Sequence, residues 1–116
     1  MWMIELISDQ PDRVVCRPVG ELDAYSVGQF RQVISEVSRS GVALKIDLML
    51  LTFIDLTGAR AIQTAARYVS RQGTRTRVVG GSEAVRRMMD LVDSCSSPAP
   101  IRALRPSFDD PGPSAC

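Results

Sequence analysis

The chain has 116 residues, 45% of them hydrophobic and 23% charged, with a formal net charge of +1. That length fits one domain with a buried core, and the balanced charge argues against nucleic-acid binding as the main task. The sequence contains no histidine, which excludes Ser-His-Asp and Cys-His catalysis and leaves no credible zinc site. It shows neither a signal-peptide pattern nor an apolar run near the ~20 residues of a membrane span, so we expect a cytoplasmic protein with no membrane partner.

The first two segments have the pattern of an antiparallel hairpin. Residues 1–7 and 13–19 read as strands, and the turn formers Ser8-Asp9-Gln10-Pro11-Asp12 separate them. Cys16 lies inside the second strand, and we interpret it as a core residue. Pro18 cannot donate to a strand ladder, so it indicates an edge, a bulge or the end of the strand.

Apolar residues that recur every three or four positions predict three helices, over residues 26–39, 57–72 and 83–92. The first should begin with a capping box, because Ser26 and Gln29 have its spacing. The second should bury one face, formed by Ile62, Ala65, Ala66 and Val69.

Two further strands are predicted over Ala43 to Leu48 and Arg75 to Val79, with a mostly apolar connection from Met49 to Asp55. A short last strand over Ile101 to Leu104 would complete a domain of residues 1–104. We expect the Pro-rich residues 105–116 to form a disordered tail. The fold class is therefore α/β: a single domain with a mixed, mostly parallel β-sheet of four to five strands and about three packed helices.

Asp55-Leu56-Thr57-Gly58 opens the second helix. Asp and Thr are common helix-capping residues, so Thr57 should present a hydroxyl at a helix N-terminus beyond the carboxyl end of a central strand. Free N–H groups and the helix dipole favour an anion at that position. A phosphate on Thr57 would be stabilised there.

One motif stands before each of the first two helices. Gly20-Glu21-Leu22-Asp23 precedes the first, and Ile46-Asp47-Leu48 followed by Phe53 to Gly58 precedes the second. Together they resemble the signatures of the STAS domain, and in particular those of free-standing bacterial anti-sigma factor antagonists. The resemblance covers roughly Met1 to Val92 and the order of the elements.

The resemblance implies a partner switch without enzyme activity, cofactor or metal. In that family the unmodified antagonist binds an anti-sigma factor, itself a serine/threonine protein kinase, and thereby frees a sigma factor. The kinase phosphorylates a Ser or Thr that corresponds to Thr57, the complex dissociates, and a phosphatase restores the antagonist. The neighbours of the acceptor are Asp23, Asp55, Leu56 and Gly58.

This sequence departs from the family pattern at two places. Leu56 is apolar where the family commonly has Ser or Thr, and Met49 and Leu50 replace small polar residues. At least one residue of Met49, Leu50 and Leu51 should face solvent, because a connection across a sheet rim cannot bury every side chain. The partner-binding surface is predicted to comprise Glu21, Asp23, Met49, Leu50 and Thr57. Alternatively, the apolar run is an extended strand tucked beneath the helices.

Other interpretations stay open. Thr57 can be a helix cap without modification, and Asp23 can serve a turn or cap rather than the acceptor. The domain can be a STAS scaffold that is never phosphorylated, or a receiver-like phosphoacceptor, although Ser8-Asp9-Gln10 and the lack of a lysine after Lys45 disfavour the latter. Cys95 and Cys116 should be exposed, and no local motif supports a redox role.

Overall fold

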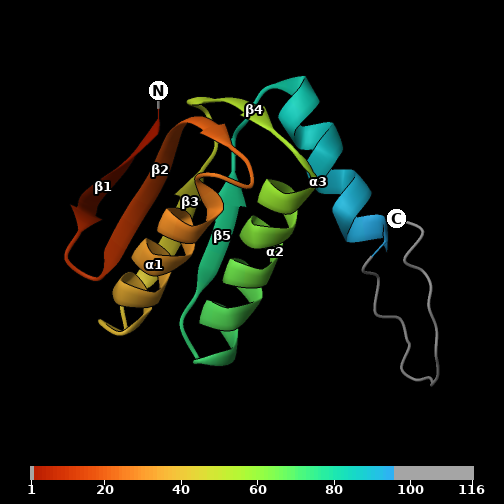
Figure 1. The fold of residues 1–116 in the computed structure, drawn as a ribbon. Helices are drawn as coiled ribbons and strands as arrows, with labels where there is room; N and C mark the ends of the chain where they lie inside the picture. The colour runs from red at the N-terminus through yellow and green to blue at the C-terminus, as the bar shows by residue number, and fades with distance from the viewer. Residues whose placement is uncertain (1, 96–116) are drawn as a thin grey trace, which may run out of the picture.

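In a computed structural model that describes residues 2–95, the chain forms three helices and a five-stranded mixed sheet (Figure 1). The elements in chain order are β1 (Trp2–Gln10), β2 (Arg13–Leu22), α1 (Val27–Ser38), β3 (Ala43–Asp47), β4 (Leu51–Ile54), α2 (Leu56–Arg71), β5 (Thr76–Val79) and α3 (Glu83–Cys95). None of these helices is long and apolar enough to cross a membrane. The predicted fold class is confirmed.

The sheet has the order β1-β2-β3-β5, and β4 pairs with the end of β2 beyond the last residue of β3. β1 and β2 form the predicted antiparallel hairpin, whereas the β2–β3, β2–β4 and β3–β5 pairs are parallel. β2 is thus the central strand, and it changes its parallel partner halfway along its length.

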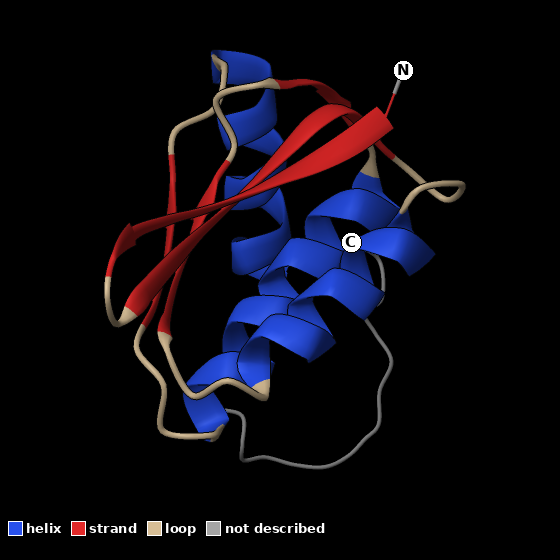
Figure 2. Ribbon diagram, turned by 90° about the vertical axis from the view of Figure 1, so that its left-hand side faces the viewer, coloured by secondary structure: helices blue, strands red, loops and turns tan. Residues whose placement is uncertain are grey.

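The core lies between the sheet and the helices α1 and α2, which lie together on one side of the sheet (Figure 2). Phe30 of α1, Ile62 of α2 and Ile46 of β3 are fully buried members of this core. Cys16 is also fully buried as a free thiol, which confirms its core interpretation. Burial raises the pKa of the Cys16 thiol to about 12, so the thiol stays protonated at neutral pH.

The strands differ from the prediction by more than one residue in three places. β1 extends to Gln10 and β2 extends to Leu22, and the predicted connection from Met49 to Asp55 contains the strand β4. Pro18 lies neither at an edge nor at the end of its strand. It follows the last residue that pairs with β3, Cys16, and precedes the first that pairs with β4, Gly20, so its missing N–H falls where no parallel partner needs it.

The capping box predicted for α1 is absent. Ser26 is the N-cap residue, but its side chain does not bond to the helix. Its hydroxyl instead donates to the Glu21 carbonyl oxygen at 2.7 Å and accepts from the Asp23 N–H at 3.0 Å. The side chain thus fastens the β2–α1 connection rather than the helix start.

The other helix predictions are close to the structure. Ile62, Ala65 and Val69 are buried on α2, and Ala66 is half-buried. Cys95 is the last residue of α3, but its side chain lies outside the described part, as do Cys116, the strand predicted over Ile101 to Leu104 and the tail over residues 105–116.

Candidate functional site

The β2–β4 pairing brings the two sequence motifs together. Glu21 lies opposite Phe53, and Leu22 lies opposite Ile54. The Asp55 N–H donates to the Leu22 carbonyl oxygen at 3.4 Å. Because the two strands are parallel, Asp23 and Asp55 leave the sheet at the same edge.

Asp55 is the N-cap of α2. Its backbone is extended, and its Oδ1 accepts from the Gly58 N–H at 2.8 Å. The N–H groups of Leu56 and Thr57 precede the first residue that a helical carbonyl can bond, so they remain available to an anion. Among residues 56–59, the first turn, none is acidic.

Thr57 is the second residue of α2 and is exposed. Its hydroxyl makes no hydrogen bond to any residue in the described range. The adjacent Leu56 is half-buried and packs against the core. An apolar residue at position 56 is therefore explained by packing, and the hydroxyl at position 57 is the one that faces solvent.

Gly58 is required by a close approach rather than by its backbone angles. A Cβ at this position would lie 2.2 Å from the Leu22 carbonyl oxygen and 3.0 Å from Ile54 Cγ1. The first turn of α2 therefore rests directly on the end of β2. The start of α2 therefore lies at the end of β2, where Asp23 follows Leu22 in the chain.

Asp23 is half-buried and its carboxylate is turned toward its own loop. Oδ1 accepts from the N–H groups of Tyr25 at 3.0 Å and Ser26 at 3.3 Å. This is the turn role that the sequence left open for Asp23. It leaves Oδ2 without a hydrogen bond from the described residues, and a partner can use that oxygen.

The connection between β3 and β4 exposes two apolar side chains. Met49 is 62% exposed and Leu50 is 39% exposed, whereas Leu48 and Leu51 are buried. The expectation that at least one residue of this run faces solvent is confirmed, and the alternative of a fully tucked run is wrong. The Leu50 carbonyl oxygen accepts from the Gly20 N–H at 3.2 Å, which ties the connection to β2.

A network of polar side chains binds the backbone of Met49 to the sheet. The Asp47 Oδ1 accepts from the Met49 N–H at 3.0 Å, and Oδ2 accepts from the Arg17 Nε at 3.3 Å. Arg17 also forms an ion pair with Glu5 of β1 at 3.2 Å. The network spans β1, β2 and β3, so the exposed connection is anchored to the sheet.

Sequence reasoning missed two exposed aromatic side chains at this edge. Tyr25 is 97% exposed and Phe53 is 48% exposed. Tyr25 follows Asp23 by two residues, and Phe53 lies inside the second motif beside Glu21. We call the surface formed by these residues and the predicted ones the switch edge; it comprises Glu21, Asp23, Tyr25, Met49, Leu50, Phe53 and Thr57.

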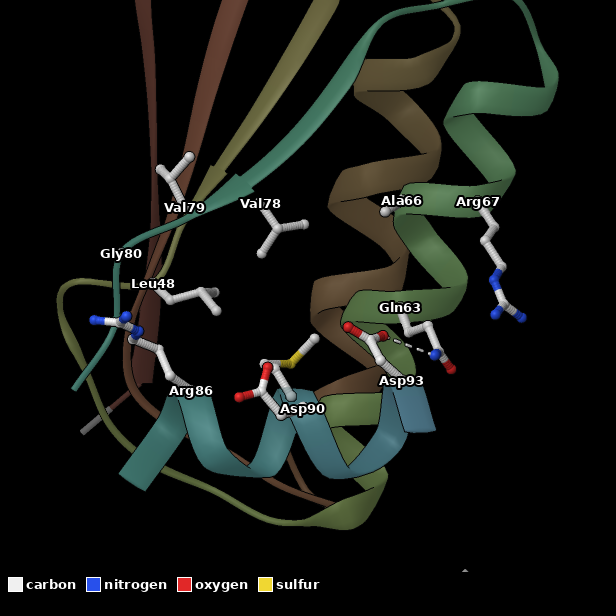
Figure 3. A pocket seen from close by; sticks show the side chains of 11 residues that line it. Leu48, Gln63, Ala66, Arg67, Val78, Val79, Gly80, Arg86, Asp90 and Asp93 are labelled. Carbon is white, nitrogen blue, oxygen red and sulfur yellow. Dashed lines mark hydrogen bonds between the residues drawn. The ribbon is translucent and has the colours of Figure 1, made fainter. Parts of the chain in front are cut away.

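One hollow of the described part of the chain lies away from the switch edge. It has a volume of about 710 Å³ and lies between α2, α3 and the end of β5 (Figure 3). Its walls carry both basic and acidic side chains, and Gln63 bonds to Asp93 across it at 3.0 Å. No predicted site residue lines it. Within residues 2–95 there is also no cluster of potential metal ligands.

A smaller hollow of about 320 Å³ belongs to the switch edge and is lined by Trp2, Glu21, Asp23, Tyr25 and Ser26. The rest of the edge is an exposed apolar and acidic surface. This geometry suits contact with a macromolecule better than enclosure of a small molecule.

Comparison with known proteins agrees with the two motifs. The chain belongs to the STAS domain family, whose model matches residues 5–108. No curated protein is similar enough to count as a relative. Among solved structures, the fold matches that of the anti-sigma factor antagonist SpoIIAA in its unphosphorylated form, which is 26% identical with a TM-score of 0.65 over 77% of this chain and 79% of that chain.

The SpoIIAA of Bacillus in its phosphorylated form matches as well, with 25% identity and a TM-score of 0.63 over 77% of this chain and 82% of that one. An anti-sigma factor antagonist from Mycobacterium paratuberculosis has the same fold, with 23% identity and a TM-score of 0.68 over 84% of this chain and 80% of that one. The fold is therefore that of anti-sigma factor antagonists in both phosphorylation states.

The Gly58 contact makes a testable prediction. Gly58→Ala should lower the free energy of unfolding by about 1–3 kcal/mol, because the added methyl group overlaps the Leu22 carbonyl oxygen. Gly28→Ala is the matched control, since a Cβ at Gly28 in α1 meets nothing within 4 Å. Urea unfolding of both variants measures the difference. Equal stability of Gly58→Ala and the unmodified protein would contradict the close packing of α2 on β2.

Proposed function

We propose that the protein is an anti-sigma factor antagonist that binds an anti-sigma factor of the serine/threonine protein kinase type and so frees a sigma factor. Phosphorylation of Thr57 by that kinase ends the binding, and a phosphatase restores it. The protein acts in the cytoplasm as a regulator and not as an enzyme. The observation that carries this proposal is the exposed hydroxyl of Thr57 at the start of α2, which bonds to none of residues 2–95 and lies at the end of the sheet where both family motifs meet.

A phosphate on Thr57 would leave the fold intact. It adds about −1.5 to −2 charge, and the free N–H groups of the first helical turn stabilise that charge locally. The phosphate would lie on the same edge as the carboxylates of Glu21 and Asp23. The combined negative charge and the added bulk would repel a partner that had packed closely against Thr57.

The apolar side chains of the switch edge supply the docking surface. Met49, Leu50, Phe53 and Tyr25 are exposed on connections or strand ends that the sheet holds firmly. Exposed aromatic and apolar side chains surrounded by charged groups are typical of protein interfaces. In this proposal the apolar residues bind the partner, and the phosphorylation state of Thr57 determines whether the complex persists.

Of the two alternatives, a STAS scaffold that is never phosphorylated uses the same edge with Thr57 unmodified. The engagement of Asp23 with its own turn is compatible with it. The receiver-like alternative is contradicted by the family match and by the antiparallel β1–β2 hairpin, which a doubly wound parallel sheet lacks.

The first prediction of this proposal concerns the acceptor. Thr57→Glu should weaken binding to the cognate anti-sigma kinase, and Thr57→Ala should bind normally but no longer be released by ATP. Both variants should stay folded, because Thr57 makes no hydrogen bond within the described structure. Thr64→Glu, an exposed threonine on the same helix, is the control and should bind normally. Labelling of Thr57→Ala by the kinase to the normal extent would show that the acceptor lies elsewhere.

The second prediction concerns the docking surface. Met49→Ser and Leu50→Ser should each weaken binding about tenfold or more, since burying such a side chain contributes ~1.5–3 kcal/mol before entropic costs. Thermal unfolding should change little, because both side chains are already exposed. Leu91→Ser on α3, 51% exposed and away from the switch edge, is the matched control. Unchanged affinity in both Met49→Ser and Leu50→Ser would remove these residues from the interface.

A further inference from the structure

The outer edge of β1 has the features of a surface that pairs with another strand. β1 is nine residues long, and within residues 2–95 only β2 pairs with it; Figure 2 views the protein from the side on which β1 forms the edge of the sheet. Met3, Leu6 and Ile7 are 45%, 51% and 37% exposed.

Sheets usually protect such an edge with lysine, proline, a bulge or a very short strand. β1 contains no lysine or proline, and its two acidic residues, Glu5 and Asp9, form ion pairs with Arg17 and Arg13 of β2. Its one irregularity lies at the end, between Ser8 and Gln10. The opposite edge strand, β5, has only four residues and carries an exposed Arg77. The two edge strands of the sheet thus differ in length and in charge, and β1 is the less protected of the two.

The backbone groups that face outward can be identified from the pairing of β2. The Gly20 N–H and the Leu22 carbonyl oxygen bond toward β4, so even-numbered residues of β2 direct their groups away from β1. Odd-numbered residues of β2 therefore bond to β1, and their partners there are Met3, Glu5 and Ile7. The outer edge of β1 presents the N–H and carbonyl groups of Ile4, Leu6 and Ser8.

We propose that this edge binds β1 of a second copy of the chain, antiparallel, across a two-fold axis at Leu6. In this register Trp2 faces Gln10 of the other copy, and Leu6 faces Leu6. The whole of β1 from Trp2 to Gln10 is therefore paired. The outward groups of Leu6 meet those of Leu6 in the partner, and those of Ile4 meet Ser8. All the exposed backbone groups of both strands find partners.

The charges along β1 select this register. In it Glu5 faces Ile7 of the other copy and Asp9 faces Met3. Sliding one β1 past the other by two residues keeps each side chain on the same face of the sheet. A slide in one direction places Glu5 opposite Glu5 of the other copy, and a slide in the opposite direction places Glu5 opposite Asp9. Like charges directly opposite each other are destabilising. The Leu6-centred register is thus the full-length pairing that opposes no like charges.

The pairing also covers apolar surface. Leu6 lines a groove of about 320 Å³ between β1 and α1, together with Val14 and Val37. Directly opposed residues of antiparallel strands have Cβ atoms about 5 Å apart, so the second Leu6 would lie against the exposed half of the first. On the other face of the sheet, Ile7 would be covered by Glu5, whose carboxylate is already held by Arg17.

The assembly leaves the proposed switch intact and does not depend on it. The two-fold axis reverses the strand direction, so the two switch edges lie at opposite ends of the joined sheet. The dimer would present two separate docking surfaces, each with its own Thr57. A partner with two binding sites would then gain avidity if it could reach both.

Sedimentation equilibrium of the full chain over a range of concentrations tests the proposal. The protein should associate reversibly to a dimer, and Leu6→Lys should weaken association by about tenfold or more, because two lysines would face each other at the axis. Leu91→Lys is the control, since Leu91 is exposed to the same 51% but lies on α3, and it should leave the dimer unchanged. Circular dichroism checks that both variants remain folded.

Oxidative cross-linking tests the register. In a background of Cys95→Ser and Cys116→Ser, Leu6→Cys should form a covalent dimer readily, whereas Ser8→Cys should not, because Ser8 faces Ile4 of the other copy. A protein that is monomeric at all concentrations would overturn the proposal, and so would a dimer that is indifferent to Leu6→Lys. Slow hydrogen exchange of the Ile4, Leu6 and Ser8 amides in a monomeric protein would also overturn the proposal. It would indicate that another part of the same chain covers the edge of β1.

Discussion

The Leu22 carbonyl oxygen is the point on which the site depends. It accepts a hydrogen bond from the Asp55 N–H, and it leaves no room for a side chain at Gly58. This contact exists because β2 continues past the end of β3 and takes β4 as a second parallel partner. Without that exchange of partners the two family motifs would end on separate parts of the sheet. With it, a loop that begins at Asp23 and a helix that begins after Asp55 share one edge.

In the proposed function, the same arrangement separates the groups that stabilise the fold from those that regulate binding. The groups that hold the edge together are backbone atoms, the Asp55 cap and the network of Glu5, Arg17 and Asp47. The groups that face outward, Thr57 among them, contribute few contacts of their own. A charge added at Thr57 therefore acts on whatever is bound there and hardly on the fold. A phosphorylation switch needs that separation, because the modified protein must remain folded to be restored.

Much of the fold was predictable because its long elements carry strong patterns. The hairpin, the three helices and the parallel strands β3 and β5 follow from apolar periodicity and turn residues. β4 was not predictable, because it is only four residues long and lacks the alternation of buried and exposed side chains that marks a strand. Leu51 and Ile54 are both buried although they are three residues apart, because the pairing with β2 is irregular between them. Leu22 was likewise read as leaving the strand, since its partner in β4 was unknown.

The sequence proposed a set of residues for the candidate site, but it did not predict the surface on which they lie. The resemblance to the STAS motifs pointed to Asp23, Asp55 and Thr57, and helix-capping chemistry located Thr57 at a helix start. The exposure of Tyr25 and Phe53 depends on which way a loop and a short strand turn their side chains, and no local pattern encodes that. The hydrogen bonds of Ser26 could not be predicted either, because its hydroxyl donates to the Glu21 carbonyl oxygen and not to a group of the helix.

The central claim is that Thr57 modification controls a protein partnership at the switch edge. Its most direct test is to capture the anti-sigma kinases of the same genome on the immobilised protein, add ATP, and map phosphate on the released chain by mass spectrometry. The account predicts that one kinase binds without ATP, that ATP releases it, and that the released chain carries phosphate on Thr57. Release that leaves Thr57 unmodified, or a phosphorylated Thr57 on chains that stay bound, would contradict it.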